Sequence, residues 1–452
     1  MLLIGNMLAS FLLLAAMGPQ LGDCVSARWD TSNVASLRLI EKTPVSCLLL
    51  EPGEWDAGFL KAARALGLRV LAVVRSTEEA SRASRMEFDA LVAEGAPVEA
   101  GAAGKPVVRL TPRAGLDLDH PAEVLGTRQG LWPGIRVEKD GAAVSLPTGA
   151  PWIETNSGFL RVVRTILPGA TAFWMAIRPP EGQALSARNY VTALADAWMN
   201  GTRWVFALDR GFSKGLFAGD ERYVAEWRKI GAGWTFLESV RDYGRWPDQS
   251  SLSLIQDADT GALFSGGFVD MLTARHIPMR ITPTERVAKA TKETTEVLLN
   301  VGKLTADSPE RQMLMGLAKQ GITVFNSPLD WNPGRPKGDV FTIAEEDVKG
   351  LADAWREINT MLGRRNFGLR VFGAPSMLSN LKISPDGKRR AVHLLNYSDY
   401  PVENISLHLT GVFKTARVLT PQGERKAEVY PIEGGTEVEV DKVDDVAVVV
   451  IE

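Results

Sequence analysis

The feature that most constrains the fold is an alternation of short apolar runs with helical periods between about Pro44 and Glu238. This order is typical of parallel β/α units. About seven or eight strands in about 200 residues is close to the lower size limit of a (β/α)8-type barrel, which is the fold we expect. An open doubly wound sheet is the alternative, but its first strand would lack a Gly-rich phosphate turn. The expected strands are 44–50, 68–74, 88–93, 107–110, 171–177 and 203–208, with one more through Trp152 and Ile153, and helices such as 57–66 and 190–198 lie between them.

Two further domains are expected after the barrel. The stretch 243–250 (YGRWPDQS) reads as a linker, and a shorter α/β alternation beyond it predicts a flavodoxin-like α/β domain. From about Val371 the helical periods stop, and alternating apolar residues predict a small antiparallel β-sandwich. We therefore expect a signal peptide, a (β/α)8-like barrel, a flavodoxin-like α/β domain and a β-sandwich over residues 1–27, 28–245, 246–370 and 371–452.

The first 18 residues form an apolar run that is too short for a convincing membrane anchor and suits a secretory signal. The best small-residue cleavage site ends at Ala27, although no Lys or Arg precedes the run. We expect a secreted or periplasmic protein with no integral membrane segment after signal removal. Leu21 to Cys24 looks like a lipoprotein box, but Asp23 argues against lipidation. Cleavage after Ala27 would leave Cys47 as the one cysteine, which predicts a buried apolar residue and no disulfide.

Charge and inventory exclude several classes of function. The formal net charge is −3 and the basic residues are spread along the chain, so neither nucleic acid nor an anionic membrane is expected as a partner. The four His are scattered, which predicts no metal site, no cofactor and no Ser-His-Asp triad on the barrel. The twelve Trp suit a carbohydrate partner, because ring faces stack on sugars, but Trp also fills large cores.

Carboxylates end three of the expected strands and are the candidate catalytic residues: Glu51, Glu154 and Asp209. In a parallel barrel these strand ends meet at one mouth. Glycoside hydrolysis needs two carboxyl groups, one protonated and one ionised. We expect Glu154, next to Trp152, to be the acid, with Asp209 or Glu51 as its partner. The alternative is that Glu51 and Asp209 simply cap the turns that follow them.

Further side chains are candidates for binding substrate. Asn156 and Ser157 lie beside Glu154 and can bind hydroxyl groups. The segment 126–149 interrupts the β/α rhythm, and its Asp140-Gly141 pair predicts a hairpin that lies over the site. Other residues expected at the mouth are Arg109, Arg128, Gln129, Trp132, Trp152 and Arg178, with the tryptophans as stacking platforms.

The order of domains resembles that of the β-galactosidases whose barrel is followed by a trimerisation domain and a β-sandwich. The resemblance rests on SLSLIQD, FSGGFVDMLTARHIPMRI and TEVLLNV in the middle of the chain, and on VHLLNYSDYPVENISLHLTG and VEVDKVDDVAVVVIE near its end. It implies a carbohydrate-active barrel and a possible homo-oligomer. Those enzymes place an Asn-Glu pair after the fourth strand and a second Glu after the seventh. Here the order is Glu154-Thr155-Asn156, so we transfer no catalytic residue.

Three hypotheses follow from the sequence. The first is a secreted glycoside-hydrolase-like protein that acts on a carbohydrate through paired carboxylates. The second is a barrel without catalysis that binds glycan or a protein partner at the same mouth, which the missing Asn-Glu pair favours. The third is a structural oligomer assembled through the middle domain.

Overall fold

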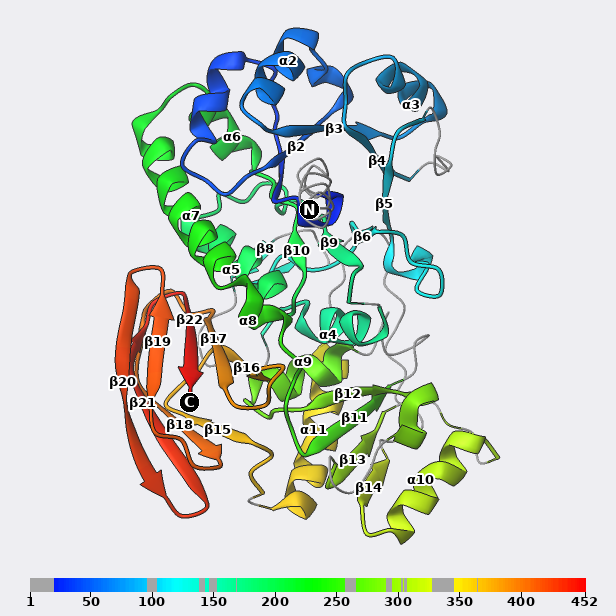
Figure 1. Cartoon of the computed structure of the whole chain (residues 1–452), viewed down its shortest axis with the longest axis vertical. Helices are drawn as coiled ribbons and strands as arrows, with labels where there is room; N and C mark the ends of the chain where they lie inside the picture. The colour runs from blue at the N-terminus through cyan, green and yellow to red at the C-terminus, as the bar shows by residue number, and fades with distance from the viewer. Residues whose placement is uncertain are drawn as a thin grey trace, which may run out of the picture.

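The computed structural model describes residues 20–95, 104–137, 143–145, 153–167, 169–256, 266–289, 295–301, 304, 307–326, 345–363 and 365–452. Its three domains follow one another along the chain (Figure 1). The barrel is at the top of the view, the antiparallel domain at the lower left and the smaller parallel sheet at the lower right. Within these ranges, no helix combines the length and apolarity needed to cross a bilayer.

The barrel is an eight-stranded parallel sheet with the order β1-β2-β3-β4-β5-β6-β9-β10. Its two edge strands meet, because Phe206 N donates to Ser26 O at 2.9 Å and Arg28 N donates to Phe206 O at 2.7 Å. The sheet is therefore nearly closed, which confirms the predicted (β/α)8-type barrel. The strands are Ser26–Arg28, Cys47–Leu50, Arg69–Val74, Ala90–Glu94, Val107–Thr111, Val124–Thr127, Ala172–Met175 and Arg203–Trp204.

Helices cover the outside of the barrel and form its largest core with the outward faces of the strands. The long α7 lies along α5 (Figure 1), and Phe206 stacks on Trp234 of α7 with ring centroids 5.0 Å apart. The helices are α2 (Ala57–Ala65), α3 (Thr77–Ser84), α4 (Ser157–Ile166), α5 (Ala187–Trp198), α6 (Arg210–Phe217), α7 (Glu221–Ser239) and α8 (Arg241–Arg245).

A separate apolar cluster fills the inside of the barrel. It contains alternate strand residues such as Leu49, Val73 and Val92, as expected for strands whose side chains point inward at every second position. Leu21 and Cys24, which precede β1, belong to the same cluster. The segment before β1 therefore closes the amino-terminal end of the barrel.

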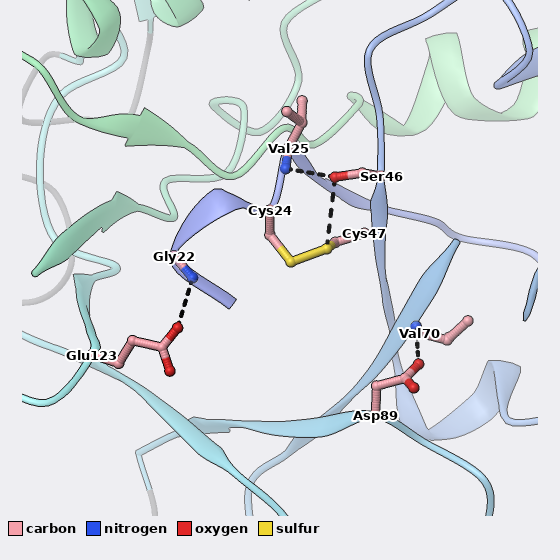
Figure 2. Close-up of a disulfide and its surroundings, with 8 residues drawn as sticks. All are labelled: Gly22, Cys24, Val25, Ser46, Cys47, Val70, Asp89 and Glu123. Carbon is pink, nitrogen blue, oxygen red and sulfur yellow. Dashed lines mark hydrogen bonds between the residues drawn. A yellow bond between two sulfur atoms is a disulfide. The ribbon is translucent and has the colours of Figure 1, made fainter. Parts of the chain in front are cut away.

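A disulfide between Cys24 and Cys47 ties this segment to β2, with the two Cα atoms 5.5 Å apart (Figure 2). Val25 N also donates to Ser46 Oγ at 3.0 Å. The prediction that Cys47 is a lone thiol is therefore wrong. Cleavage after Ala27 would remove Cys24 and most of β1, whose Ala27 is fully buried. Ser26 and Ala27, which resemble the small residues of a cleavage site, are buried residues of a barrel strand.

The second domain is a four-stranded parallel sheet with the order β12-β11-β13-β14. The second, first, third and fourth strands of this domain stand in that order, and its flavodoxin-like character stays a prediction. Its strands are β11 (Leu252–Gln256), β12 (Arg280–Pro283), β13 (Val297–Asn300) and β14 (Thr323–Asn326), and its helices are α9 (Gly266–Ala274), α10 (Pro309–Lys319) and α11 (Glu345–Leu362).

The third domain is an eight-stranded antiparallel sheet with a barrel-like core of its own. Its residues alternate in burial along strands such as β21, as predicted for this region. The domain packs through β16 on α9 and through β17 on α5, so it touches both other domains. Its strands are β15 (Leu369–Phe372), β16 (Met377–Ile383), β17 (Arg390–Asn396), β18 (Val402–Thr410), β19 (Ala416–Thr420), β20 (Gly423–Ile432), β21 (Gly435–Val443) and β22 (Val446–Ile451).

The hairpin expected within 126–149 is present as the antiparallel pair β7 (Ile135–Val137) and β8 (Ala143–Ser145). Its Asp-Gly turn lies outside the described residues. Near the hairpin, Gly134 lies against Tyr397 of the third domain. The hairpin region thus meets the third domain, and the expected lid role stays a prediction.

Candidate functional site

Charged side chains form the topmost inward layer of the barrel, at the carboxyl ends of the strands. Leu49, Val73, Val92 and Ala176 belong to the apolar interior. Two residues further along the chain, the same inward positions hold Glu51, Arg75, Glu94 and Arg178. Since inward residues recur at every second position, these side chains converge on the mouth. We call this set, together with Arg28 and Asp30, the mouth cluster.

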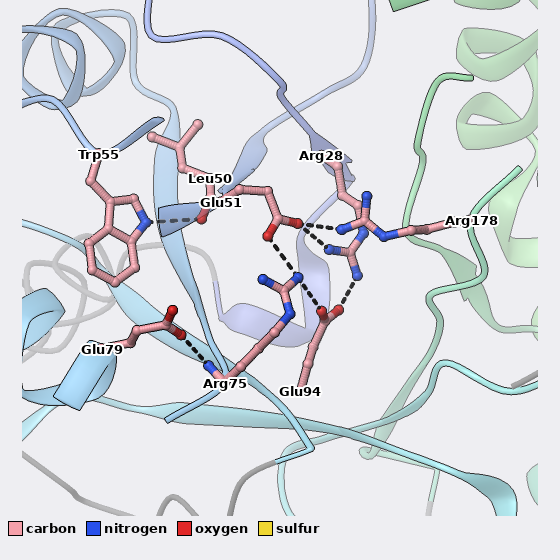
Figure 3. Close-up of polar contacts among 8 residues, drawn as sticks. All are labelled: Arg28, Leu50, Glu51, Trp55, Arg75, Glu79, Glu94 and Arg178. Atoms are coloured by element: carbon pink, nitrogen blue, oxygen red, sulfur yellow. Dashed lines mark hydrogen bonds and ion pairs between the residues drawn. The ribbon is translucent and has the colours of Figure 1, made fainter. Parts of the chain in front are cut away.

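Arg28 is the centre of the mouth cluster, and its side chain is only 2% exposed. Its Nη1 donates to Glu51 Oε1 at 3.0 Å, and its Nη2 forms an ion pair with Glu94. Arg75 Nη2 contacts Glu51 Oε2 at 2.7 Å and Glu94 Oε2 at 2.9 Å, and Arg178 pairs with Glu51. Figure 3 shows the three guanidinium groups gathered around the two carboxylates.

These contacts keep both glutamates ionised. Burial opposes ionisation of Glu51, but the charges of Arg28, Arg178 and Arg75 outweigh it and hold the pKa of Glu51 below its ordinary value. Burial likewise opposes ionisation of Glu94, and the charge and hydrogen bond of Arg28 lower the pKa of Glu94. At neutral pH neither glutamate can therefore donate a proton.

The pKa of Asp30 shifts in the opposite direction to the pKa values of the two glutamates. The register pairs Arg28 with Leu49, so its continuation places Asp30 level with Glu51 on the neighbouring strand. Ser213 Oγ of α6 donates to Asp30 Oδ2 at 3.2 Å. Burial raises the pKa of Asp30, and the nearby charge of Glu51 acts in the same direction against Arg178. The side chain nevertheless remains open to solvent.

Asp30 and Glu51 thus form a pair of neighbouring carboxyl groups whose environments shift their pKa values in opposite directions. Such pairs are how one site holds a proton donor beside an ionised carboxylate. Both groups are accessible, since Glu51 is 22% exposed. The mouth therefore presents two carboxyl groups in different environments, and glycoside hydrolysis uses such a pair.

Glu154 lies elsewhere. It belongs to the irregular segment before α4 and not to a strand, so the expected strand end is wrong. Its side chain is 0% exposed and its Oε1 accepts from Arg136 Nε at 2.6 Å. The neighbouring α4 begins against the second domain, where Gly158 N donates to Asp270 of α9. This corner therefore forms an interface between domains.

Asp209 and Asn156 both have structural partners. Asp209 is the N-cap of α6, where its Oδ1 accepts from Phe212 N at 2.9 Å, and its Oδ2 accepts from Tyr190 Oη at 2.8 Å. Asn156 is fully buried and bonds both backbone groups of Leu131. For Asp209, these contacts match the capping alternative that the sequence left open.

The other predicted mouth residues divide into three groups. Arg178 is at the mouth, and the guanidinium of Arg128 lies against Gly95, which follows Glu94. Arg109 is exposed between the inward residues of β5, so it points away from the interior. Two residues are not open at the mouth, because Trp132 is buried against Tyr190 and Trp204 and Gln129 is buried on Arg113. Trp152 lies outside the described residues.

Sequence reasoning missed Arg28, Asp30, Arg75 and Glu94 as site residues. Arg75 directly follows β3 and Glu94 ends β4, so the search for charged residues at strand ends that selected Glu51 could have selected them. Arg28 and Asp30 were not considered because the expected signal peptide ended at Ala27, within β1. The signal that could have revealed them is the pattern of Val25, Ala27 and Trp29, three apolar residues that alternate with the polar residues Ser26 and Arg28.

No protein-family model matches the chain, and no curated protein sequence matches it. Among solved structures, an α-L-fucosidase isoenzyme 2 from Paenibacillus thiaminolyticus aligns over 95% of this chain and 99% of its own, with a TM-score of 0.63 and 11% identity. A rhamnosidase from Novosphingobium sp. PP1Y aligns over 87% and 38%, with a TM-score of 0.45 and 12% identity. A GH42 β-galactosidase from G. stearothermophilus aligns over 87% and 65%, with a TM-score of 0.34 and 10% identity.

The likeness to the fucosidase covers all three domains of this chain and shows a shared fold at low identity. The chain therefore has a glycoside-hydrolase-like architecture. At this identity the likeness transfers neither a substrate nor a catalytic residue, because one fold hosts many activities.

Proposed function

We propose that the protein is a glycoside hydrolase whose site is the mouth cluster, with Asp30 as general acid and Glu51 as the ionised carboxylate. The observation that carries this proposal is the pairing of Asp30 and Glu51 on neighbouring strands with pKa values shifted apart. Asp30 would protonate the leaving oxygen, and Glu51 would stabilise or attack the sugar carbon on the other side of the bond.

The supporting context is the architecture. Parallel β/α barrels place their active sites at the carboxyl ends of the strands, where this cluster lies. The barrel end opposite the mouth is closed by the disulfide-bound segment before β1. A substrate therefore has access to the inward charged layer from the mouth side.

The alternative is a glycan-binding barrel without turnover. It is favoured by the engagement of Glu51 with Arg28, Arg75 and Arg178, because a carboxylate held by three cations is a weak nucleophile. Under this alternative Arg75 and Arg178, which are 42% and 50% exposed, would hold an acidic sugar at the mouth.

Two assays on the same panel separate the alternatives. Aryl glycosides, with the α-L-fucoside included because of the fold likeness, are assayed for hydrolysis, and the parent sugars and uronic acids are assayed for binding by calorimetry. Hydrolysis that Glu51→Gln and Asp30→Asn each reduce at least a hundredfold supports the enzyme. Binding without hydrolysis supports the alternative, and equal hydrolysis by wild type and both variants refutes the assignment of this site.

We also propose that the protein is exported. A disulfide that links two buried cysteines at the base of the barrel is typical of proteins that fold in an oxidising compartment. Any cleaved signal would have to end before Cys24, because β1 and the disulfide both need the residues that follow. The apolar run 1–18 keeps its interpretation as a signal, although it lies outside the described residues.

A further inference from the structure

A cavity lies at the end of the barrel opposite the mouth. It has a volume of about 470 Å³ and is lined by residues of all three domains. Thr171 and Arg203 mark the amino-terminal ends of β9 and β10, whereas Arg280 comes from the second domain and Lys382 from the third. The cavity is therefore separate from the mouth cluster, which forms at the carboxyl ends of the same strands.

Positive charge dominates the lining of this cavity. Seven basic side chains meet four acidic ones there. The seven are Arg161, Arg164, Arg203, Arg241, Arg245, Arg280 and Lys382, and the four are Asp23, Glu123, Glu238 and Asp248. This local excess contrasts with the formal net charge of −3 for the whole chain.

Three of the four acidic residues are paired with basic residues of the same lining, and the fourth, Glu123, accepts from Gly22 N at 3.3 Å. Asp248 is shared by Arg161 at 3.1 Å and Lys382 at 2.7 Å. Glu238 pairs with Arg203 at 2.6 Å, and Asp23 pairs with Arg241 at 3.3 Å.

Two arginines remain without a carboxylate among the described contacts. Arg164 Nη1 donates to the carbonyl of Thr171 at 2.7 Å, and Arg245 has no ion pair in the part of the chain that the structure describes.

The charges of Arg164 and Arg245 act on each other across this lining. Burial, followed by the charge of Arg245, lowers the pKa of Arg164, which indicates mutual repulsion between these cations.

We propose that this cavity binds an oxyanion of the phosphate or sulfate class, either free or as the ester group of a sugar. Arg164, Arg245 and Arg280 come from α4, α8 and β12, so positive charge enters the lining from three elements. A tetrahedral oxyanion offers acceptors in several directions, whereas a carboxylate offers two oxygens in one plane. Because its lining joins the three domains, the bound anion would hold them together. The proposal is independent of the reaction proposed for the mouth.

The test measures binding to the intact chain by calorimetry at constant ionic strength. Inorganic phosphate, sulfate and glucose 1-phosphate are titrated, with chloride as the reference anion. We expect saturable binding of at least one of the three, and a rise in Tm that grows with its concentration. Tighter binding of the sugar phosphate than of inorganic phosphate identifies an ester as the ligand, and equal binding identifies the free anion.

Arg245→Gln is the diagnostic variant, because this side chain is exposed and its loss should not unfold the protein. We expect it to weaken anion binding about tenfold or more. Arg38→Gln, an exposed change elsewhere on the barrel, should leave the affinity unchanged. Arg178→Gln tests the mouth as a competing site. An affinity that Arg178→Gln reduces and Arg245→Gln does not, or an absence of binding beyond that of chloride, would overturn the proposal.

Discussion

Arg28 and Glu94 come from strands that are not neighbours, β1 and β4, and an ion pair between their side chains crosses the inside of the barrel. Both side chains are almost completely buried, at 2% and 6% exposure. A buried carboxylate without its partner is costly, so this pair makes the start of the chain essential to the mouth cluster.

Removing Arg28 should therefore destabilise the barrel strongly. We expect Arg28→Met to lower the free energy of unfolding by about 3–5 kcal/mol, because Glu94 keeps its burial and loses its main cation. Arg75→Gln is the matched change, since Arg75 contacts the same carboxylates from a side chain that is 42% exposed. It should cost no more than about 1 kcal/mol. Urea unfolding measures both, and similar losses would show that burial of the pair is not the cause.

Asp248 should control the acid stability of the domain junction. Burial opposes its ionisation, but Arg161 of α4 and Lys382 of β16 lower the pKa of Asp248 to about 2. Because folding lowers the pKa of Asp248, its ion pairs stabilise the protein fully above the pKa of an aspartate in the unfolded chain, about 4. It is lost as the pH falls toward about 2.

We therefore expect Asp248→Asn to cost about 3–5 kcal/mol at neutral pH and to flatten the dependence of Tm on pH below about 4. Calorimetric scans across this range test the expectation. A variant with the same acid limb as wild type would assign the acid sensitivity to other carboxylates.

The disulfide should contribute measurably to stability. It closes a loop between positions 23 residues apart, which constrains the unfolded chain. The double variant Cys24→Ser and Cys47→Ser should lose about 3 kcal/mol. Guanidinium unfolding with and without a reductant gives the comparison, and the reductant should have no effect on the double variant. Detection of two free thiols in denatured, unreduced protein would refute the disulfide.

The amino terminus of exported material should lie at or before Cys24. Sequencing of protein recovered from the periplasm or the medium measures it directly. A terminus at Arg28 would mean that β1 and the disulfide are absent from the mature protein, and it would contradict the barrel closure between Ser26 and Phe206.

The sequence predicted most of the barrel because its strands are buried on both faces and read as continuous apolar runs. Leu49 and Val73 are examples, each fully buried inside the barrel. β6 was missed because Gly126 and Thr127 interrupt the apolar run in this short strand. Gly126 is required there, since a Cβ would lie 2.4 Å from Leu110.

The candidate site was predicted less well, because its assembly depends on register across the barrel. The rule of strand-end carboxylates found Glu51 and the cap Asp209, but it could not reveal that Arg28 and Arg75 would surround Glu51. The catalytic role expected for Glu154 stays a prediction, but its surroundings differ from those expected. Its apolar neighbourhood, read as an environment for a catalytic acid, is the buried contact between domains.

The most direct test of the proposed site compares two leaving groups. On the glycoside that the panel identifies, kcat/KM of Asp30→Asn is measured for a poor leaving group and for an activated dinitrophenyl one. A general acid is needed only by the first, so we expect a loss of about 10²–10⁴ there and little loss with the second. The alkaline limb of the pH profile should also disappear, since it reports deprotonation of Asp30, while Asp209→Asn keeps both the limb and the activity. Equal losses for both leaving groups, with the alkaline limb retained, would contradict the assignment of Asp30 as the acid.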